Sequence, residues 1–213
     1  MQITERAKNI EPSATLSISA RAKALQKQGR DIISFSAGEP DFDTPSVIKE
    51  EAKKAIDEGF TKYTPTSGIP ELKEAISKKL EGENGLFYSP REIIVSCGAK
   101  HSLFNAILTL CNPGDEVLLP KPYWVTYLEQ IKLAGGKPVF LEPSPATFTA
   151  GIEEIRKALT PCARILILNN PSNPTGVVWE EEELEKIAEL AKEQDLVVIS
   201  DEIYERLTYD GAK

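Results

Sequence analysis

Three side chains with different chemistry stand next to segments of buried character in this sequence. Trp124 carries a flat aromatic ring, Asn173 holds an amide between two prolines, and Asp201 ends an aliphatic run. An indole can stack on a planar ring, and an amide N–H₂ can donate to an oxygen at a fixed angle. A buried carboxylate needs a cationic partner because burial of an unpaired charge is costly. For Asp201 that partner is a metal ion, an arginine or a protonated ring nitrogen.

Each of these residues also has an ordinary structural explanation. A tryptophan in a loop often anchors packing, and an asparagine beside prolines forms turns. Gly98, Ala99 and Lys100 begin a predicted helix, whose free N–H groups suit a phosphate, but a plain strand-to-helix turn has the same features. Neither GxGxxG nor GxxxxGK[ST] occurs in the chain, so the usual nucleotide fingerprints are missing.

Strands and helices alternate along the second half of the chain. Strands are predicted at 92–97, 115–120, 137–142, 164–170 and 196–200, and helices at 100–110, 124–134, 152–159 and 180–194. The later strands are continuous aliphatic runs, which are typical of a parallel sheet with helices on both faces. The sequence therefore predicts an α/β fold with three layers, αβα, around a mostly parallel sheet. Ligands of such sheets bind beyond the carboxyl ends of the strands, where Trp124, Asn173 and Asp201 are expected.

The first part of the chain has a different character. Residues 1–44 are irregular and rich in turns, apart from a helical pattern at 17–28. Thr44 and Pro45 resemble an N-cap and first turn, and apolar residues at helical spacing follow as far as Gly59. A further helix is predicted at 69–80.

Composition and charge exclude several classes of function. The 213 residues are 41% hydrophobic and 27% charged, as in soluble globular proteins, and the net charge of −8 argues against nucleic acid or an anionic membrane as partner. Cys97, Cys111 and Cys162 lack metal-site spacing and are expected to be buried, reduced thiols of a cytoplasmic protein. His101 is the only histidine, so a His-rich metal site is excluded, and we expect it on an exposed helix surface.

Five segments occur in an order that resembles the class I aminotransferases. They are SAGEPDFDTP, KYTPTSGIPELKEAI, PYWVTY, NNPSNPTG and SDEIYERLTYDG. These enzymes have fold type I and depend on pyridoxal 5′-phosphate (PLP), and the chain most resembles their bacterial aspartate aminotransferase branch. The resemblance covers nearly the whole chain. It implies that residues 1–44 form an N-terminal arm and part of a small domain, and that 45–213 form an incomplete PLP-binding large domain.

The resemblance also implies a role for each residue at the cofactor ring. Asp201 would pair with the protonated pyridine nitrogen and keep PLP an electron sink. Asn173 and Tyr204 would donate hydrogen bonds to its phenolic oxygen, and Trp124 would stack on the ring.

Phosphate and substrate contacts follow from the same resemblance. The residues implied at the phosphate are Gly98, Ala99, Lys100 and, from the neighbouring subunit of a homodimer, Tyr63. Gly38 would lie against the substrate α-carboxylate. Lys100, together with Ser13 and Thr15, would bind a side-chain carboxylate, so the amino donor would be aspartate or glutamate and the acceptor a 2-oxo acid.

One essential part of the family's machinery has no counterpart in this sequence. The Schiff-base lysine of the family lies downstream of the aspartate of SDEIY, and only Lys213 follows Asp201 here. The chain is therefore interpreted as the N-terminal half of an enzyme, inactive alone, whose sheet keeps five strands with a gap. Two alternatives remain open: an inactive PLP-binding or regulatory module, and a hydrolase or phosphatase that uses Asp201 with a metal, which leaves Trp124 unexplained.

Overall fold

The computed structural model describes residues 3–40 and 42–211, and these form two compact units. Within the described residues, one unit contains 3–11 and 97–211, and the other contains 12–40 and 42–96. The boundary after residue 44 that we predict from the sequence does not coincide with this division and stays a prediction.

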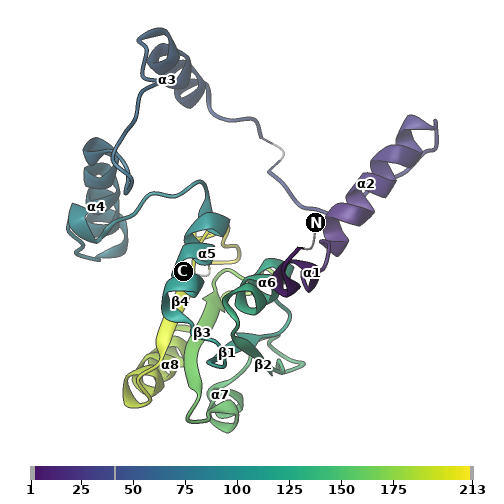
Figure 1. The fold of residues 1–213 in the computed structure, drawn as a ribbon, viewed down its shortest axis with the longest axis vertical. Helices are drawn as coiled ribbons and strands as arrows, with labels where there is room; N and C mark the ends of the chain where they lie inside the picture. Colours follow the sequence, from purple (N-terminus) through teal and green to yellow (C-terminus); the bar gives the residue numbers. More distant parts are fainter. Residues whose placement is uncertain (1–2, 41, 212–213) are drawn as a thin grey trace. The chain divides into compact units, whose positions relative to one another are not determined.

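A four-stranded parallel sheet forms the centre of the first unit (Figure 1). Its strands are β1 (Glu116–Pro120), β2 (Lys137–Leu141), β3 (Ala163–Asn169) and β4 (Val197–Asp201), in the order β2-β1-β3-β4. β1 and β3 lie in the middle and are almost entirely buried. Their unbroken aliphatic sequences follow from this position, because both faces of a central parallel strand pack against helices.

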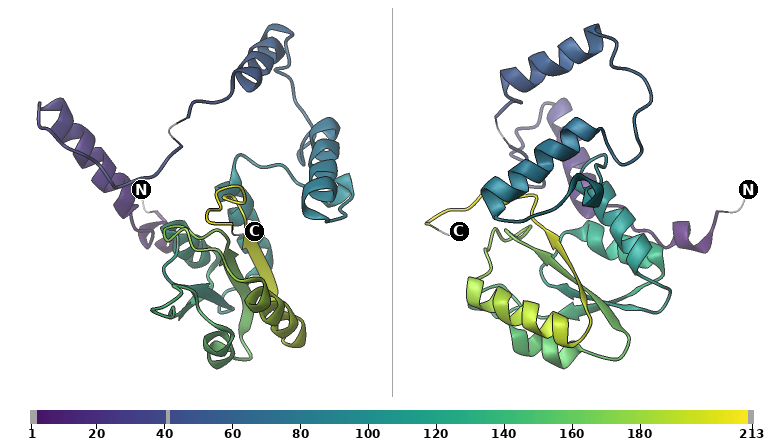
Figure 2. Two further views of the ribbon diagram at one scale, coloured as in Figure 1. Left: turned by 180° about the vertical axis from the view of Figure 1, so that it is seen from behind. Right: turned by 90° about the vertical axis from the view of Figure 1, so that its left-hand side faces the viewer.

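Helices cover both faces of the sheet, as the two views of Figure 2 show. α5 (Ala99–Leu110) and α6 (Val125–Ala134) share a core with one face of β1 and β3. α7 (Ile152–Ala158) and α8 (Glu181–Glu193) share a second core with the other face. The αβα prediction is therefore confirmed, and the four helices begin and end within two residues of their predicted bounds.

The predicted strand at 92–97 is wrong. Residues 90–92 form a short 3₁₀ helix, η1 (Pro90–Glu92), and the extended segment after it pairs with no strand of the sheet in the described structure. Instead, the Val95 N–H in this segment donates a hydrogen bond to the carbonyl oxygen of Ser67, 3.0 Å away, and Ile94 is 71% exposed. An aliphatic run becomes a strand only where a neighbouring strand offers its N–H and C=O groups, and residues 3–40 and 42–211 provide no such strand beside this one.

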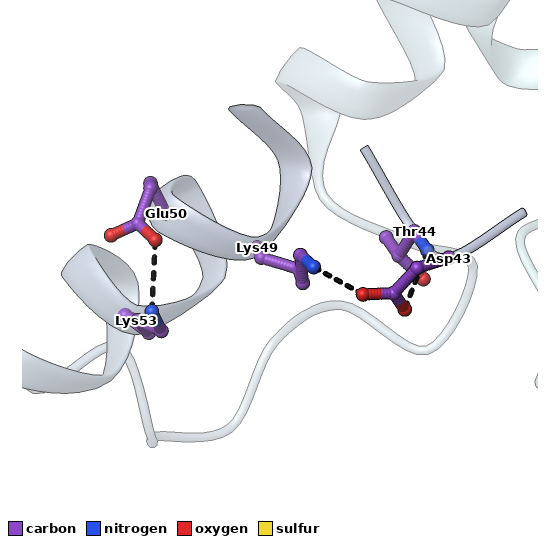
Figure 3. A network of polar contacts seen from close by, with 5 residues as sticks. All are labelled: Asp43, Thr44, Lys49, Glu50 and Lys53. Atoms are coloured by element: carbon purple, nitrogen blue, oxygen red, sulfur yellow. Dashed lines mark hydrogen bonds and ion pairs between the residues drawn. The ribbon is translucent and has the colours of Figure 1, made fainter. Parts of the chain in front are cut away.

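The second unit consists of helices joined by extended segments. They are α2 (Ala14–Lys27), α3 (Ser46–Asp57) and α4 (Pro70–Asn84), while the short α1 (Glu5–Lys8) belongs to the first unit. α3 starts one residue later than Thr44-Pro45 suggests, with Pro45 as its N-cap. Asp43 supports that start, since it accepts hydrogen bonds from the Thr44 N–H and the Lys49 ammonium group (Figure 3), which lower the pKa of its carboxyl group.

The cysteines differ in part from their predicted environment. Cys111 is buried, whereas Cys97 and Cys162 are exposed, and all three are free thiols. The prediction of three buried thiols is therefore wrong for two of them, because Cys97 lies in the loop before α5 and Cys162 in the turn before β3. His101 is exposed on α5, as predicted.

None of the helices within 3–40 and 42–211 has the length and apolar character that crossing a membrane requires.

Candidate ligand site at the carboxyl edge of the sheet

β3 and β4 end side by side and bring two polar residues together. Asn169 and Asp201 are register partners at the last positions of the two strands. The Asn169 side chain donates from Nδ2 to the Asp201 carbonyl oxygen, 2.9 Å away, and the Asn170 N–H donates to the same oxygen. The strand ends are therefore tied to each other where the chain leaves the sheet.

The Asp201 carboxylate is buried, with 7% of the residue exposed. Its Oδ2 accepts a hydrogen bond from the Tyr127 hydroxyl at 2.7 Å, and its Oδ1 accepts one from the Ile203 N–H at 3.2 Å. Both donors are neutral, and within the described residues no lysine or arginine forms an ion pair with this carboxylate. A carboxylate has about four lone-pair positions, so two remain for a cation from outside the chain.

Tyr127 is a site residue that the sequence analysis missed. It lies on α6, is 1% exposed, and its ring packs edge-on against the Trp124 indole, with 5.5 Å between centroids and 88° between planes. Burial, followed by the hydrogen bond to Asp201, raises the pKa of the Tyr127 hydroxyl, so this group stays a proton donor. The available signal was its spacing, because a residue three positions after Trp124 lies on the same face of a helix.

Trp124 is the N-cap residue of α6 and is partly buried against the core shared by α5 and α6. The ammonium group of Lys100 lies 4.9 Å from the centre of the indole ring. This distance is typical of a cation–π contact. Trp124 thus connects, through Tyr127, to the Asp201 carboxylate and, through Lys100, to the start of α5.

The asparagine-proline turn after β3 is held by its own side chains. Asn169 Oδ1 accepts a hydrogen bond from the Asn173 N–H at 2.6 Å, and Asn170 Oδ1 accepts one from the Trp179 N–H at 3.0 Å. The Asn173 side chain is thereby directed toward Tyr204, and its Nδ2 donates a long hydrogen bond of 3.4 Å to the tyrosine hydroxyl. The two groups that we expected to share one ligand oxygen lie next to each other.

The start of α5 is open. Gly98 is its N-cap residue, with φ of 86° and ψ of 163°, a conformation that is essentially limited to glycine. No side chain caps the helix, so the first N–H groups of α5 stay available for an anion. A Cβ atom at Gly98 would meet no atom within 4 Å, and the glycine is therefore required by the backbone conformation alone.

The structure brings together seven of the residues predicted for cofactor binding, all in the first unit. They are Gly98, Ala99, Lys100, Trp124, Asn173 and Asp201, with Tyr204 beside Asn173. The other predicted residues belong to the second unit. Ser13 caps α2 and lies 2.8 Å from the Thr15 hydroxyl, Gly38 has no atom near its missing Cβ, and Tyr63 is fully exposed.

The chemistry of this edge suits a flat ligand that carries a positive charge in its ring and an anionic group on a side arm. Asp201 offers two free acceptor positions, the indole offers an aromatic face, and α5 offers N–H groups. PLP has a pyridine ring, a phenolic oxygen and a phosphate, so the residues present fit this cofactor. Within the described residues, no group of three or more His, Cys, Asp or Glu side chains is arranged to hold a metal ion.

Comparison with known proteins agrees with this geometry. The family model described as "Aminotransferase class I and II" matches residues 30–213. An aspartate aminotransferase of Bacillus sp. (strain YM-2) is 48% identical over 99% of the chain, and a probable aspartate/prephenate aminotransferase of Aquifex aeolicus is 50% identical over 99% of it. Each is covered over 54% of its own length, so the chain spans about half of the relatives that it matches.

Solved structures of aminotransferases also match this chain over almost its whole length. An aspartate aminotransferase from Thermus thermophilus with maleate has a TM-score of 0.96 and 46% identity, over 99% of this chain and 56% of that one. An alanine aminotransferase from Pyrococcus furiosus has a TM-score of 0.93 and 34% identity, over 99% of this chain and 54% of the other.

Proposed function

Because the chain belongs to the class I and II aminotransferase family, whose members depend on PLP, we propose that it binds PLP at the carboxyl edge of its sheet. We further propose that this binding serves the transfer of an amino group between an amino acid and a 2-oxo acid. The single observation that carries the proposal is the buried Asp201 carboxylate, which has only neutral donors within the described chain.

The cost of burying Asp201 supports a cationic ligand. A buried carboxylate without a positive partner is unfavourable, and a protonated pyridine nitrogen supplies both the charge and an N–H donor. When bound, PLP supplies an electron sink for a carbanion at the α-carbon of the amino acid, provided that its ring nitrogen stays protonated. Asp201 holds that proton in place, and the Tyr127 hydroxyl fixes the direction of the carboxylate.

The other residues of the edge orient the ligand. The Trp124 indole packs on one face of the ring, the Asn173 amide and the Tyr204 hydroxyl donate to its phenolic oxygen, and the first turn of α5 binds its phosphate. Two of these groups are held in place by the chain itself, Trp124 by Tyr127 and Asn173 by Asn169. A preformed site loses little side-chain entropy on binding.

The substrate and the assembly are parts of the same proposal. Lys100 places a positive charge 4.9 Å from the centre of the Trp124 indole, which favours an amino donor with a second carboxylate, aspartate or glutamate. Several similar proteins are aspartate or aspartate/prephenate aminotransferases, which supports this choice. The roles of Ser13, Thr15, Gly38 and Tyr63, the homodimer and the cytoplasmic location stay predictions.

The test is a binding measurement with a matched pair of variants. Equilibrium dialysis with PLP is expected to show binding to the protein, and Asp201→Asn is expected to weaken it about 100-fold, since a charged hydrogen bond is lost. Asp195→Asn is the control, because Asp195 is exposed and its positive φ of 50° suits asparagine. Equal binding by all three proteins, or none by any, would refute the proposal.

The same samples report how the cofactor is held. The contacts proposed at the sheet edge, from Asp201, Trp124 and the first turn of α5, are all noncovalent, so we expect dialysis against buffer to remove the absorbance of PLP. Retention of the label after borohydride reduction would contradict this and identify a lysine of this chain as the covalent partner.

A further inference from the structure

Gln130 is a polar side chain in the packing between α5 and α6. It is 5% exposed, and the other buried residues of its helix are Tyr127 and Ile131. Its Nε2 donates a hydrogen bond to the carbonyl oxygen of Lys100, 2.9 Å away. Only the N–H₂ end of an amide can donate to a carbonyl, so this contact determines which way the amide points. The Oε1 atom is buried and has no hydrogen-bond partner within the described residues.

Stability alone does not explain a glutamine at this position. A buried amide with one unsatisfied atom weakens the folded state, and a methionine of similar length would fill the same space without that penalty. What a methionine cannot do is hold the Lys100 carbonyl. The contact is made with the first turn of α5, two residues after the Gly98 N-cap.

Lys100 is held at two points, and both belong to the same neighbouring helix. Gln130 binds its main-chain carbonyl, and the indole of Trp124, the N-cap residue of α6, lies against its ammonium group. The open start of α5 and the aromatic face of Trp124 are therefore connected through α6. Gln130 contributes the part of this connection that acts on the backbone.

We infer that Gln130 is a positioning residue that fixes the first turn of α5 relative to Trp124. Through this spacing a ligand's phosphate and its planar ring are bound at the same time. The inference rests on the proposed function, because it takes PLP as the ligand. Gln130 acts through the backbone of α5. Its effect is therefore expected on the additional affinity that a phosphate group gives to a ligand whose ring is already bound.

The test compares PLP with pyridoxal, which has the same ring and a hydroxyl group in place of the phosphate. Equilibrium dialysis gives the dissociation constant of each ligand. The dissociation constant of pyridoxal divided by that of PLP measures how much the phosphate contributes to affinity. In Gln130→Met this ratio is expected to fall about fivefold, as for the loss of one hydrogen bond. The affinity for pyridoxal and the melting temperature are expected to stay unchanged or to rise. Gln194→Met, the same change at an exposed position, is the control and is expected to keep the ratio.

A second measurement needs no ligand. Amide hydrogen exchange in the free protein is expected to become faster in the first turn of α5 in Gln130→Met, and to stay unchanged in α8. Gln130→Leu provides a second apolar variant, so the comparison does not depend on the folding of one protein.

The outcomes separate the two proposals. If the wild type prefers PLP over pyridoxal and both apolar variants keep that preference, the inference about Gln130 is overturned while the proposed function stands. If the variants lose stability and bind both ligands equally less well, Gln130 has only a structural role, which also overturns it. If the wild type binds neither ligand, the proposed function fails and the inference fails with it.

Discussion

Two buried carboxylates lie at opposite ends of the same sheet and are treated differently by the fold. Glu116 begins β1 and is 6% exposed, and it accepts hydrogen bonds from the Lys137 ammonium group at 2.8 Å and from the Thr160 hydroxyl. Asp201 ends β4 and has only a tyrosine hydroxyl and a backbone N–H. The chain pairs the acid at the amino end of the sheet with a cation, whereas none of the described lysines and arginines forms an ion pair with Asp201 at the carboxyl end.

The difference separates a structural charge from a functional one. Glu116 and Lys137 are register partners on β1 and β2, so their ion pair connects adjacent strands and needs nothing from outside. Asp201 keeps acceptor positions that the fold leaves open, at the edge where parallel sheets bind ligands. Two acids of comparable burial therefore have different roles, one structural and one in ligand binding. The hydrogen-bond partners of each acid indicate which role it has.

After the loss of about 100-fold expected for Asp201→Asn, the next largest effect is expected from removal of the group that orients Asp201. Tyr127→Phe removes one hydroxyl and leaves the carboxylate free to turn, so the affinity for PLP is expected to fall about tenfold. Equilibrium dialysis measures this change. Tyr123→Phe is the control, because Tyr123 stacks on Phe140 with centroids 5.6 Å apart and keeps that contact without its hydroxyl. An equal loss of affinity for PLP in the two variants would show that the Tyr127 hydroxyl does not act by orienting the Asp201 carboxylate.

A smaller effect, on stability, is expected to distinguish the two acids directly. Glu116→Gln breaks an ion pair and is expected to lower the melting temperature by a few degrees, because Lys137 and Thr160 lose their charged partner. Asp201→Asn removes a buried charge that has no cation, and the melting temperature of the free protein is expected to stay the same or to rise. Thermal unfolding of the two variants side by side tests this, and a larger loss in Asp201→Asn would reverse the assignment of roles.

The smallest effect is the pH dependence of the stability that Glu116 contributes through its ion pair with Lys137. The hydrogen bonds from Lys137 and Thr160 hold the pKa of Glu116 below its ordinary value of 4.5. A lowered pKa in the folded state means that the contribution to stability is complete above pH 4.5 and is lost as the pH falls through the folded value. The difference in melting temperature between wild type and Glu116→Gln should therefore be constant near neutral pH and shrink in acid. A difference that grows in acid would contradict the ion pair as its cause.

The sequence predicted most of the sheet unit because its signals are local. Aliphatic runs such as 164–170 and the helical pattern of 180–194 identify their elements without reference to the rest of the chain. The run at 92–97 shows the limit, since a strand also requires a neighbour, and Ile94 and Val95 have none in the sheet. Pairing is a property of the whole fold and is not encoded in the run itself.

The candidate site was predictable to a similar degree. Asp201, Asn173 and Trp124 stood out because their residue types are unusual where they occur. Tyr127 and Gln130 did not, because a tyrosine and a glutamine on a helix attract no notice until their partners are known. Their hydrogen bonds to Asp201 and Lys100 join residues that are 74 and 30 positions apart in the chain.

β3 and β4 end at register partners, Asn169 and Asp201, and this alignment limits where the chain can gain or lose residues. Side chains alternate between the two sides of a strand, and Asp201 shares the side of Ile199, which packs toward α5 and α6. Gain or loss of one residue inside β4 would turn the acid toward the opposite layer, where α7 and α8 form an apolar core. Insertions between β3 and β4 are therefore tolerable in the connecting loops and harmful in the strand, and a library of length variants would map that boundary one residue at a time.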